Sequence, residues 1–234
     1  IAAEVALRYA RRGARLYLVG RSHDKLDAVA DRLGDAVVGR VNADLDDTAG
    51  NEALVHAAHE RLGTIDVALV AHGLLGDQLA TERSYAQAEA ILRTNLLSPV
   101  SLIIPLANLL EQQGHGHLAV ISSVAGERGR PRNYTYGAAK GALTLYLQGV
   151  RSRLWDRGVK ISTFKLGPVD SPMTVGHPRN ALFSTPEAVA DRIVDHLDRG
   201  GGEGFVPWFW APIMGAVRRL PEPLFQRLGF LSGR

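Results

Sequence analysis

The chain has 234 residues, 46% of them hydrophobic and 22% charged, which is typical of an ordinary globular protein with a sizeable core. Its 27 basic and 24 acidic residues leave a net charge of only +3, which argues against a nucleic-acid-binding protein. No cysteine is present, which excludes disulfides, thiolate metal sites and cysteine nucleophiles, and we predict no metal site. The longest apolar run, residues 96–110, contains two prolines and is too short for a transmembrane span.

Short apolar segments, as expected of buried parallel strands, alternate with segments of helical periodicity along the chain. The predicted strands are residues 14–20, 35–45, 65–73, 117–124, 160–167 and 204–208. The predicted helices are residues 1–12, 23–33, 48–62, 84–113, 134–157 and 186–198. This alternation predicts a doubly wound α/β fold, a Rossmann-like parallel sheet with helices on both faces, in a single domain over residues 1–234.

The predicted helix at residues 1–12 has no strand in front of it in this sequence. In a doubly wound nucleotide-binding sheet the first strand is central, and the glycine loop after it holds the cofactor pyrophosphate. Without that strand, backbone groups of its neighbours would be buried and unpaired. We therefore expect a strand and a Gly-rich loop to precede Ile1.

The stretch NYTYGAAK (133–140) places Tyr136 and Lys140 four residues apart, on one face of a helix. A nearby ammonium favours the phenolate and lowers a tyrosine pKa, so Tyr136 could exchange a proton with a carbonyl or an alcohol. The small residues around the pair would let a flat ligand approach closely. Such pairs also arise by chance, as half-exposed surface residues. Tyr134 has no lysine four positions later.

Three further motifs accompany this pair. ISSVAG (121–126) ends a predicted strand, Asn95 lies in the helix before it, and GPVDS (167–171) follows the next strand. In this order, and with YGAAK (136–140), the motifs resemble the classical short-chain dehydrogenase/reductase family over the region from Ile1 to about Met173. In that resemblance Ile1 aligns with the end of the family's Gly-rich loop and becomes a cofactor contact.

The resemblance implies a catalytic tetrad of Asn95, Ser123, Tyr136 and Lys140, and a reaction that interconverts a ketone and a secondary alcohol. Tyr136 would give its proton to the carbonyl oxygen as hydride reaches the carbon, and Ser123 would stabilise charge on the same oxygen. Lys140 would lower the pKa of Tyr136 and hold the nicotinamide ribose. Asn95 would position a water in the proton relay.

The predicted strand at residues 14–20 ends in Gly20 and is followed by Arg21 and Ser22. None of these is the acid that binds the ribose 2′-hydroxyl in NAD-preferring sites. Arg21 and Ser22 suit a 2′-phosphate, so we expect NADP(H) rather than NAD(H); the alternative is a solvent-facing arginine. Besides Tyr136 and Lys140, the resemblance implies cofactor contacts at Asp44, Leu45, Ala71, Gly73, Gly167, Val169 and Ser171. His72 departs from the family pattern, and we interpret it as a turn residue near the cofactor rather than a catalyst.

Three segments bear on the substrate. The loop before Tyr136 carries Arg128, Arg130 and Arg132, which could bind a phosphate with Tyr134 at the site entrance, or could simply be solvated. Residues 171–184 form the substrate-covering segment of the resembled family, where mobility is expected. Residues 205–234 mix aromatic residues with arginines, which suits a buried subunit contact or a lipid-facing surface.

HGLLGD (72–77), AGERGR (125–130) and the C-terminal segment also resemble one subgroup, the decaprenylphosphoryl-2-keto-ribose reductases. That resemblance implies a lipid-linked keto-sugar as substrate, a partner flavin oxidase and peripheral membrane contact through the C-terminus. A similar C-terminal segment would also suit a reductase of another lipid, or of a small carbonyl compound.

Two other functions remain as alternatives. A non-catalytic, regulatory NADP(H)-binding protein would not require the whole tetrad. A sugar-nucleotide epimerase or dehydratase usually has a larger C-terminal substrate domain than this chain can hold. We expect a cytoplasmic homodimer or homotetramer, because the helices near residues 96–110 and 142–154 are apolar.

Overall fold

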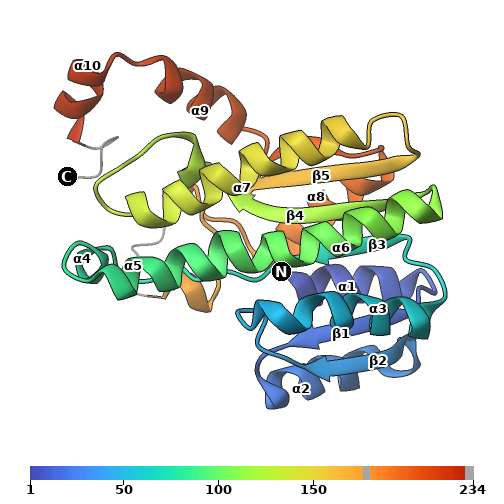
Figure 1. Cartoon of the computed structure of the whole chain (residues 1–234). Coiled ribbons are helices and arrows are strands. Elements are labelled where there is room, and N and C mark those ends of the chain that lie inside the picture. The colour runs from blue at the N-terminus through green and yellow to red at the C-terminus, as the bar shows by residue number, and fades with distance from the viewer. Residues whose placement is uncertain (176–179, 230–234) are drawn as a thin grey trace.

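The computed structural model describes residues 1–175 and 180–229, and its strands are all parallel within that part of the chain. One sheet pairs β1 (Leu16–Gly20) with β2 (Val37–Asn42). The other has the order β3 (Val67–Val70), β4 (Gly116–Ser123), β5 (Val159–Leu166) and β6 (Gly202–Val206). The predicted strands and the doubly wound parallel architecture are thus confirmed (Figure 1).

Helices cover both faces of the sheets (Figure 1). They are α1 (Ala2–Arg11), α2 (His23–Leu33), α3 (Asn51–Leu62), α4 (Gln78–Thr81), α5 (Tyr85–Leu92), α6 (Ser98–Gln113), α7 (Tyr134–Arg153), α8 (Pro186–Asp198), α9 (Trp210–Arg219) and α10 (Glu222–Arg227). Short helical turns are η1 (Gly34–Ala36), η2 (Thr48–Gly50), η3 (Arg93–Leu97), η4 (Val124–Glu127) and η5 (Pro172–Thr174), of which η3 is a π-helical turn.

Strand β4 shows how the sheet divides the core. Leu118 and Val120 face the apolar cluster formed with α3, α6 and α7, whereas Ala119 between them faces the cluster formed with α1 and α8. Successive side chains of a strand point to opposite faces, so a strand covered on both sides reads as continuously apolar. This is why the sequence pattern predicted parallel strands correctly.

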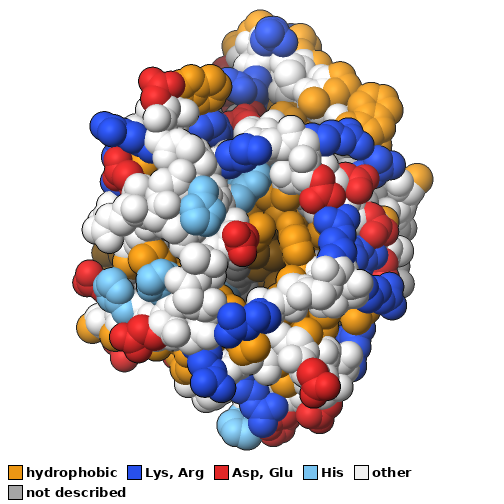
Figure 2. Space-filling view, turned by 90° about the vertical axis from the view of Figure 1, so that its right-hand side faces the viewer, with side chains coloured by type: hydrophobic (Ala, Val, Ile, Leu, Met, Phe, Trp, Pro, Cys, Tyr) orange, Lys and Arg blue, Asp and Glu red, His pale blue; other side chains and the backbone are white. Residues whose placement is uncertain are grey.

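The sheet is interrupted between β1 and β3, which are not hydrogen-bonded to each other. A cavity of about 730 Å³ separates them, lined by β1, β3 and the inner face of α1. Figure 2 shows its mouth as a hollow with an apolar floor and charged side chains at the rim.

The segment Tyr85–Gln113, which joins α5, η3 and α6, is 29 residues long and apolar enough to cross a membrane by length and composition. It is longer than the apolar run recognised in the sequence. Ile103 and Leu110 of α6 are fully buried against β4 and α7, so the segment serves as a core helix of this fold.

The C-terminal segment folds back onto its own chain. Trp210, Met214, Val217 and Phe225 of α9 and α10 form a separate apolar cluster around Val124 of η4. From the sequence we expect this segment at a subunit contact or a lipid surface, and α9 and α10 are not among the predicted helices. Its buried apolar side chains pack within the chain, whereas Trp208 is 73% and Leu224 46% exposed.

Candidate active site

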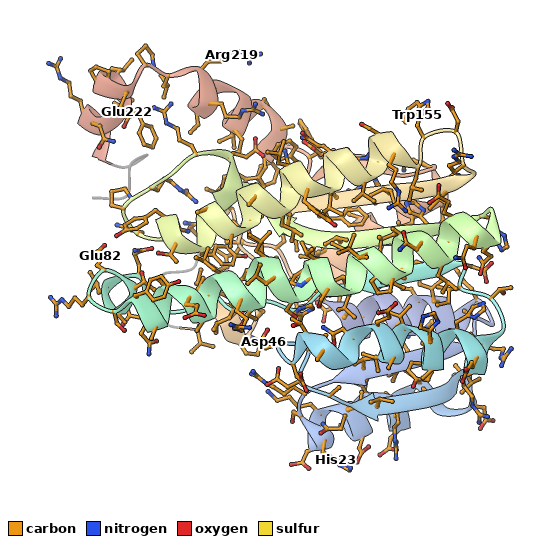
Figure 3. The ribbon with its side chains drawn as sticks, in the orientation of Figure 1. His23, Asp46, Glu82, Trp155, Arg219 and Glu222 are labelled. Carbon is orange, nitrogen blue, oxygen red and sulfur yellow. The ribbon has the colours of Figure 1, made fainter. Side chains whose placement is uncertain are left out.

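The candidate site lies at the carboxyl ends of the strands, where crevices of open α/β sheets bind ligands. Figure 3 shows that end on the left, with Glu82 between α4 and α5 and Glu222 in α10, while Trp155 marks the opposite end. Ser123 closes β4, and Tyr136 and Lys140 lie in the first two turns of α7. Asn95 lies in η3.

Two neighbouring serines at the end of β4 have different partners. The Ser122 hydroxyl donates to the Lys140 carbonyl at 3.1 Å and bonds Thr144 Oγ1 at 2.8 Å, so it fixes α7 to the strand. The Ser123 hydroxyl oxygen accepts from the Ala125 amide at 3.1 Å and caps η4. It also makes a long contact of 3.4 Å with the Leu166 carbonyl and hydrogen-bonds the Tyr136 phenol, so a substrate oxygen placed there could meet both groups.

The small residues of α7 allow η4 and α7 to pack backbone against backbone. A Cβ on Gly137 would lie 2.7 Å from the Ala125 carbonyl oxygen, and one on Gly141 would lie 2.9 Å from the Gly126 carbonyl oxygen. A side chain at either position would therefore push η4 away. These two glycines thus make room for η4 and bring Ser123 close to Tyr136, while the close approach of a flat ligand to the helix stays a prediction.

Tyr136 and Lys140 are both strongly affected by burial. Burial raises the pKa of the Tyr136 phenol to about 12, and hydrogen bonding with Ser123 offsets part of that rise. Burial lowers the pKa of the Lys140 ammonium to about 8. The ammonium donates to the Ile121 carbonyl at 3.2 Å and lies 5.9 Å from the centre of the Tyr136 ring. Burial therefore shifts the pKa of Tyr136 upward, opposite to the lowering expected from Lys140, and the phenol is protonated at neutral pH.

Asn95 is fully buried and all of its bonds are to backbone. Its side-chain oxygen accepts from the Leu74 amide at 3.1 Å, and its nitrogen donates to the Leu74 and Ile91 carbonyls at 2.7 and 2.9 Å. A Cβ on Gly73 would meet both Asn95 Oδ1 and Lys140 Nζ. Asn95 therefore fixes the segment after β3 beside Lys140. π-Helical turns such as η3 are frequent at functional sites.

His72 connects the segment after β3 to the loop after β2. Its Nε2 lies 2.8 Å from Ser98 Oγ, which itself donates to the Leu45 carbonyl at 2.7 Å. Because the Ser98 proton is used in that bond, we assign the His72 proton to Nε2. Burial, and secondly the Lys140 charge, lowers the pKa of His72 to about 4, so the imidazole is neutral. This bonding agrees with a positioning role rather than a catalytic one.

The segment after β1 is fixed by Asn42, whose side-chain amide donates to the carbonyls of Gly20 and Arg21 at 3.1 and 2.8 Å. The Arg21 side chain is 75% exposed. Its ion pair with Asp44 is long, with 3.9 Å between Nη1 and the carboxylate oxygen, so the side chain can reorient. Ser22 caps α2 by position without a side-chain hydrogen bond. The Leu45 carbonyl is held by Asn51 and Ser98.

The other expected cofactor contacts lie along the same edge. Ala71 follows β3, and Ile1 precedes α1 and packs against the α8 cluster. Gly167 follows β5 and donates to the Val206 carbonyl at 3.0 Å. Val169 is buried and forms a β-bridge with Ser184, and Ser171 forms a capping box with Thr174. Part of the expected substrate segment at 171–184, residues 176–179, lies outside the described residues.

The arginines before Tyr136 differ in their surroundings. The Arg128 guanidinium donates to the Val217 and Leu220 carbonyls at 2.7 and 2.6 Å, pairs with Glu222 at 2.6 Å, and lies 4.1 Å from the Phe225 ring centre. It closes the C-terminus of α9, which differs from the substrate role expected of it. Arg132 is exposed, and Tyr134 is 44% exposed.

Sequence reasoning did not identify two groups beside the site. The Lys165 ammonium is buried between Glu127 and Glu203, and Glu127 also pairs with Arg218 at 3.1 Å. The Trp210 indole packs directly against Gly167, where a Cβ would lie 2.0 Å from the indole Nε1. Neither has a local sequence signal, because the partners lie up to about ninety positions away in the chain.

Among residues 1–175 and 180–229, no group of three or more His, Asp and Glu residues is arranged to hold a metal.

Comparisons with known proteins agree with this geometry. A family model described as short chain dehydrogenase matches residues 1–181. An uncharacterized oxidoreductase of Mycobacterium tuberculosis is 36% identical over 231 residues, covering 97% of this chain and 92% of the relative. An uncharacterized oxidoreductase of Streptomyces coelicolor is 35% identical over 228 residues, covering 95% and 89%.

Solved structures agree as well. An alcohol dehydrogenase from the archaeon Thermococcus sibiricus, complexed with 5-hydroxy-NADP, has a TM-score of 0.76 at 22% identity and covers 86% of this chain and 89% of its own. A levodione reductase has a TM-score of 0.75 at 26% identity and covers 82% and 84%.

Proposed function

Because this chain belongs to the short chain dehydrogenase family and is an oxidoreductase, we propose that it interconverts a ketone and a secondary alcohol with NADP(H). The observation that carries the proposal is the η4–α7 contact. Backbone packing at Gly137 and Gly141 holds the Ser123 hydroxyl beside the Tyr136 phenol, with the buried Lys140 ammonium on the same helix face. A hydroxyl, a protonated phenol and an ammonium together suit proton transfer to a carbonyl oxygen.

In the direction of reduction, Tyr136 donates its proton to the carbonyl oxygen. With a pKa of about 12 the phenol carries its proton at neutral pH, so that it can act as the acid. The Ser123 hydroxyl donates a hydrogen bond to the same oxygen as negative charge develops there. The Lys140 ammonium stabilises the tyrosinate left behind. Asn95 holds the segment at Gly73 and Leu74 in place beside Lys140.

The residues along this edge fit a nicotinamide dinucleotide. A bound nicotinamide supplies or accepts the hydride. Gly73 leaves room where a Cβ would collide with Asn95 and approach Lys140 closely, and the exposed Arg21 is available to a 2′-phosphate. The two positions after β1 are Arg21 and Ser22, so neither offers a carboxylate to bind a 2′-hydroxyl. This supports NADP(H) over NAD(H). Asp44, Leu45, Ala71, Gly167, Val169, Ser171 and Ile1 complete the proposed cofactor site.

For the substrate, we extend the proposal to a keto-sugar or another polar ketone, with a lipid-linked keto-sugar as the narrowest form. The subgroup resemblance supports that form, and it brings with it a flavin oxidase partner and contact with a membrane surface. The exposed apolar side chains of Trp208 and Leu224 support a surface contact at the C-terminal segment. A cytoplasmic location and a homo-oligomeric state belong to the same proposal.

The test is turnover by full-length protein with NADPH and a panel of ketones that includes keto-sugars, followed by loss of absorbance. We expect Tyr136→Phe to lower kcat/KM by ~10²–10⁴-fold, the usual contribution of a positioned acid or base. Tyr134→Phe, which removes the neighbouring phenol, is the matched control and should leave kcat unchanged. Equal turnover by the Tyr136→Phe variant would contradict the mechanism. Absence of turnover with NADPH binding intact would favour the non-catalytic alternative.

A further inference from the structure

The loop between Ser123 and Tyr136 carries a cation without a counter-ion. Arg130 is partly buried and its Nε is shielded from solvent, yet that nitrogen has no hydrogen-bond partner. Within residues 1–175 and 180–229, no ion pair involves Arg130, although Arg128 in the same loop pairs with Glu222. Burial, and secondly the charge of Arg132, lowers the pKa of the Arg130 guanidinium. A shielded Nε without a hydrogen-bond partner on a partly buried cation is costly, so its retention needs an explanation.

The loop is fixed on either side of Arg130 rather than freely solvated. Arg128 is bonded to two carbonyls at the end of α9, and Glu127 is paired with Lys165 and Arg218. On the other side, the backbone N–H of Asn133 donates to the Arg130 carbonyl at 3.2 Å, immediately before α7 begins. A long cationic side chain on a fixed loop loses less conformational entropy when it binds a ligand.

A second polar atom of this loop is also without a partner. Asn133 Oδ1 is buried and accepts no hydrogen bond, three positions after Arg130 and three before Tyr136. Of the four such atoms among the described residues, two therefore lie in one four-residue turn beside the catalytic tyrosine. Unpaired donors and acceptors gathered in one place indicate a polar ligand that pairs with them.

We propose that Arg130 binds an anionic oxygen group, such as a phosphate, carried by the carbonyl substrate. The Nε–Nη edge of a guanidinium presents two parallel donors, which match two oxygens of a phosphate. The loop joins the two residues that contact the carbonyl oxygen, so the anion and the carbonyl belong to one molecule. This inference rests on the proposed function for the identity of the carbonyl, whereas the anion site itself does not.

Direct binding tests the anion site without catalysis. Inorganic phosphate is titrated into full-length enzyme saturated with NADP⁺, and broadening of the phosphate ³¹P resonance gives the affinity. We expect Arg130→Gln to weaken phosphate binding by at least about tenfold, the loss of a charge-assisted hydrogen bond, and Arg130→Lys to lose less. Arg219→Gln removes an exposed arginine of α9 and should change nothing. Equal affinity in the wild type and Arg130→Gln, with unchanged circular dichroism, overturns the proposal.

Turnover then separates the two sources of such a group. Three ketones are compared as substrates. D-ribulose and D-ribulose 5-phosphate differ in the phosphate. A keto-sugar phosphate attached to an isoprenyl chain, supplied in detergent, carries the phosphate on a lipid. We expect a phosphorylated ketone to be preferred and the preference to be lost as a rise in KM in Arg130→Gln, with kcat nearly kept. A preference unchanged in that variant overturns the inference. If phosphate binding depends on Arg130 but no ketone is turned over, the proposed function is contradicted. The anion site is supported in that case.

Discussion

The ionisation of Lys140 gives the candidate site a specific pH dependence. The pKa of this ammonium is lowered by burial to about 8, whereas that of Tyr136 is raised to about 12. On raising the pH from neutral, Lys140 therefore loses its charge well before Tyr136 loses its proton. In the proposed mechanism that charge stabilises the tyrosinate formed during reduction, so its loss should slow the reaction while Tyr136 is still protonated.

We therefore expect kcat/KM for ketone reduction to be flat near neutrality and to fall above about pH 8. In Lys140→Arg the charge persists to much higher pH, so whatever activity remains should keep its level beyond that point. The measurement is kcat/KM against pH, which reports the free enzyme. A falling limb at the same pH in both proteins would show that another group controls it.

At the cofactor end, Arg21 carries the prediction of NADP(H) preference. Its side chain is 75% exposed and its contact with Asp44 is long, so its removal should cost little stability. Arg21→Ala should raise KM for NADPH by roughly 10–100-fold, as expected for one charged hydrogen bond to phosphate, and leave KM for NADH nearly unchanged. Arg11→Ala, an exposed arginine at the end of α1, is the control. Parallel rises for both cofactors would contradict the 2′-phosphate role.

At the scale of elements, the contact between η4 and α7 decides whether the proposed catalytic residues Ser123 and Tyr136 meet. Alanine at Gly141 would place a Cβ 2.9 Å from the Gly126 carbonyl oxygen, whereas alanine at Gly149 of the same helix meets nothing within 4 Å. Gly141→Ala should lower the free energy of unfolding by ~1–3 kcal/mol, and kcat as well, because η4 must move. Gly149→Ala should raise it by ~0.5–1 kcal/mol. Urea unfolding of both variants tests this; equal shifts would contradict it.

The same contact shows where sequence reasoning stops. The spacing of Tyr136 and Lys140 identified the helix face correctly, because helical geometry is local. The packing of Gly137 and Gly141 against η4 could not be predicted, because a small residue admits a ligand or a backbone equally well. The partner of Arg128 could not be identified either, since it lies about ninety residues away on a helix that the sequence pattern did not reveal.

At the scale of the whole molecule, exposed apolar side chains on α6 and α7 support self-association. Ile104 is 47% exposed and Leu145 is 69% exposed, although both helices are otherwise deeply buried on their inner faces. Leu145→Glu should convert a homodimer or homotetramer into a smaller species, detected by light scattering after size-exclusion chromatography. Leu79→Glu, at a leucine of α4 that is 65% exposed, is the control. An unchanged mass in Leu145→Glu would place the interface elsewhere.

The overall architecture was predictable because its signals repeat along the chain. Each strand has its own apolar run, and Gly13, Gly34 and Gly63 take positive φ just after α1, α2 and α3, where glycine commonly ends a helix. Thr185 caps α8 through the Ala188 backbone amide. The arrangement of α9 and α10 was not predictable, because an apolar and basic segment suits its own core as well as a partner or a membrane.

The candidate site is divided between the two sheets. Arg21 follows β1 in one sheet, whereas Ser123 closes β4 in the other and Tyr136 lies in α7 beside it. A dinucleotide that reaches from Arg21 to Tyr136 would contact residues attached to both sheets. Because a ligand that binds only the folded protein stabilises it, such a dinucleotide would raise the free energy of unfolding as well as supply the chemistry.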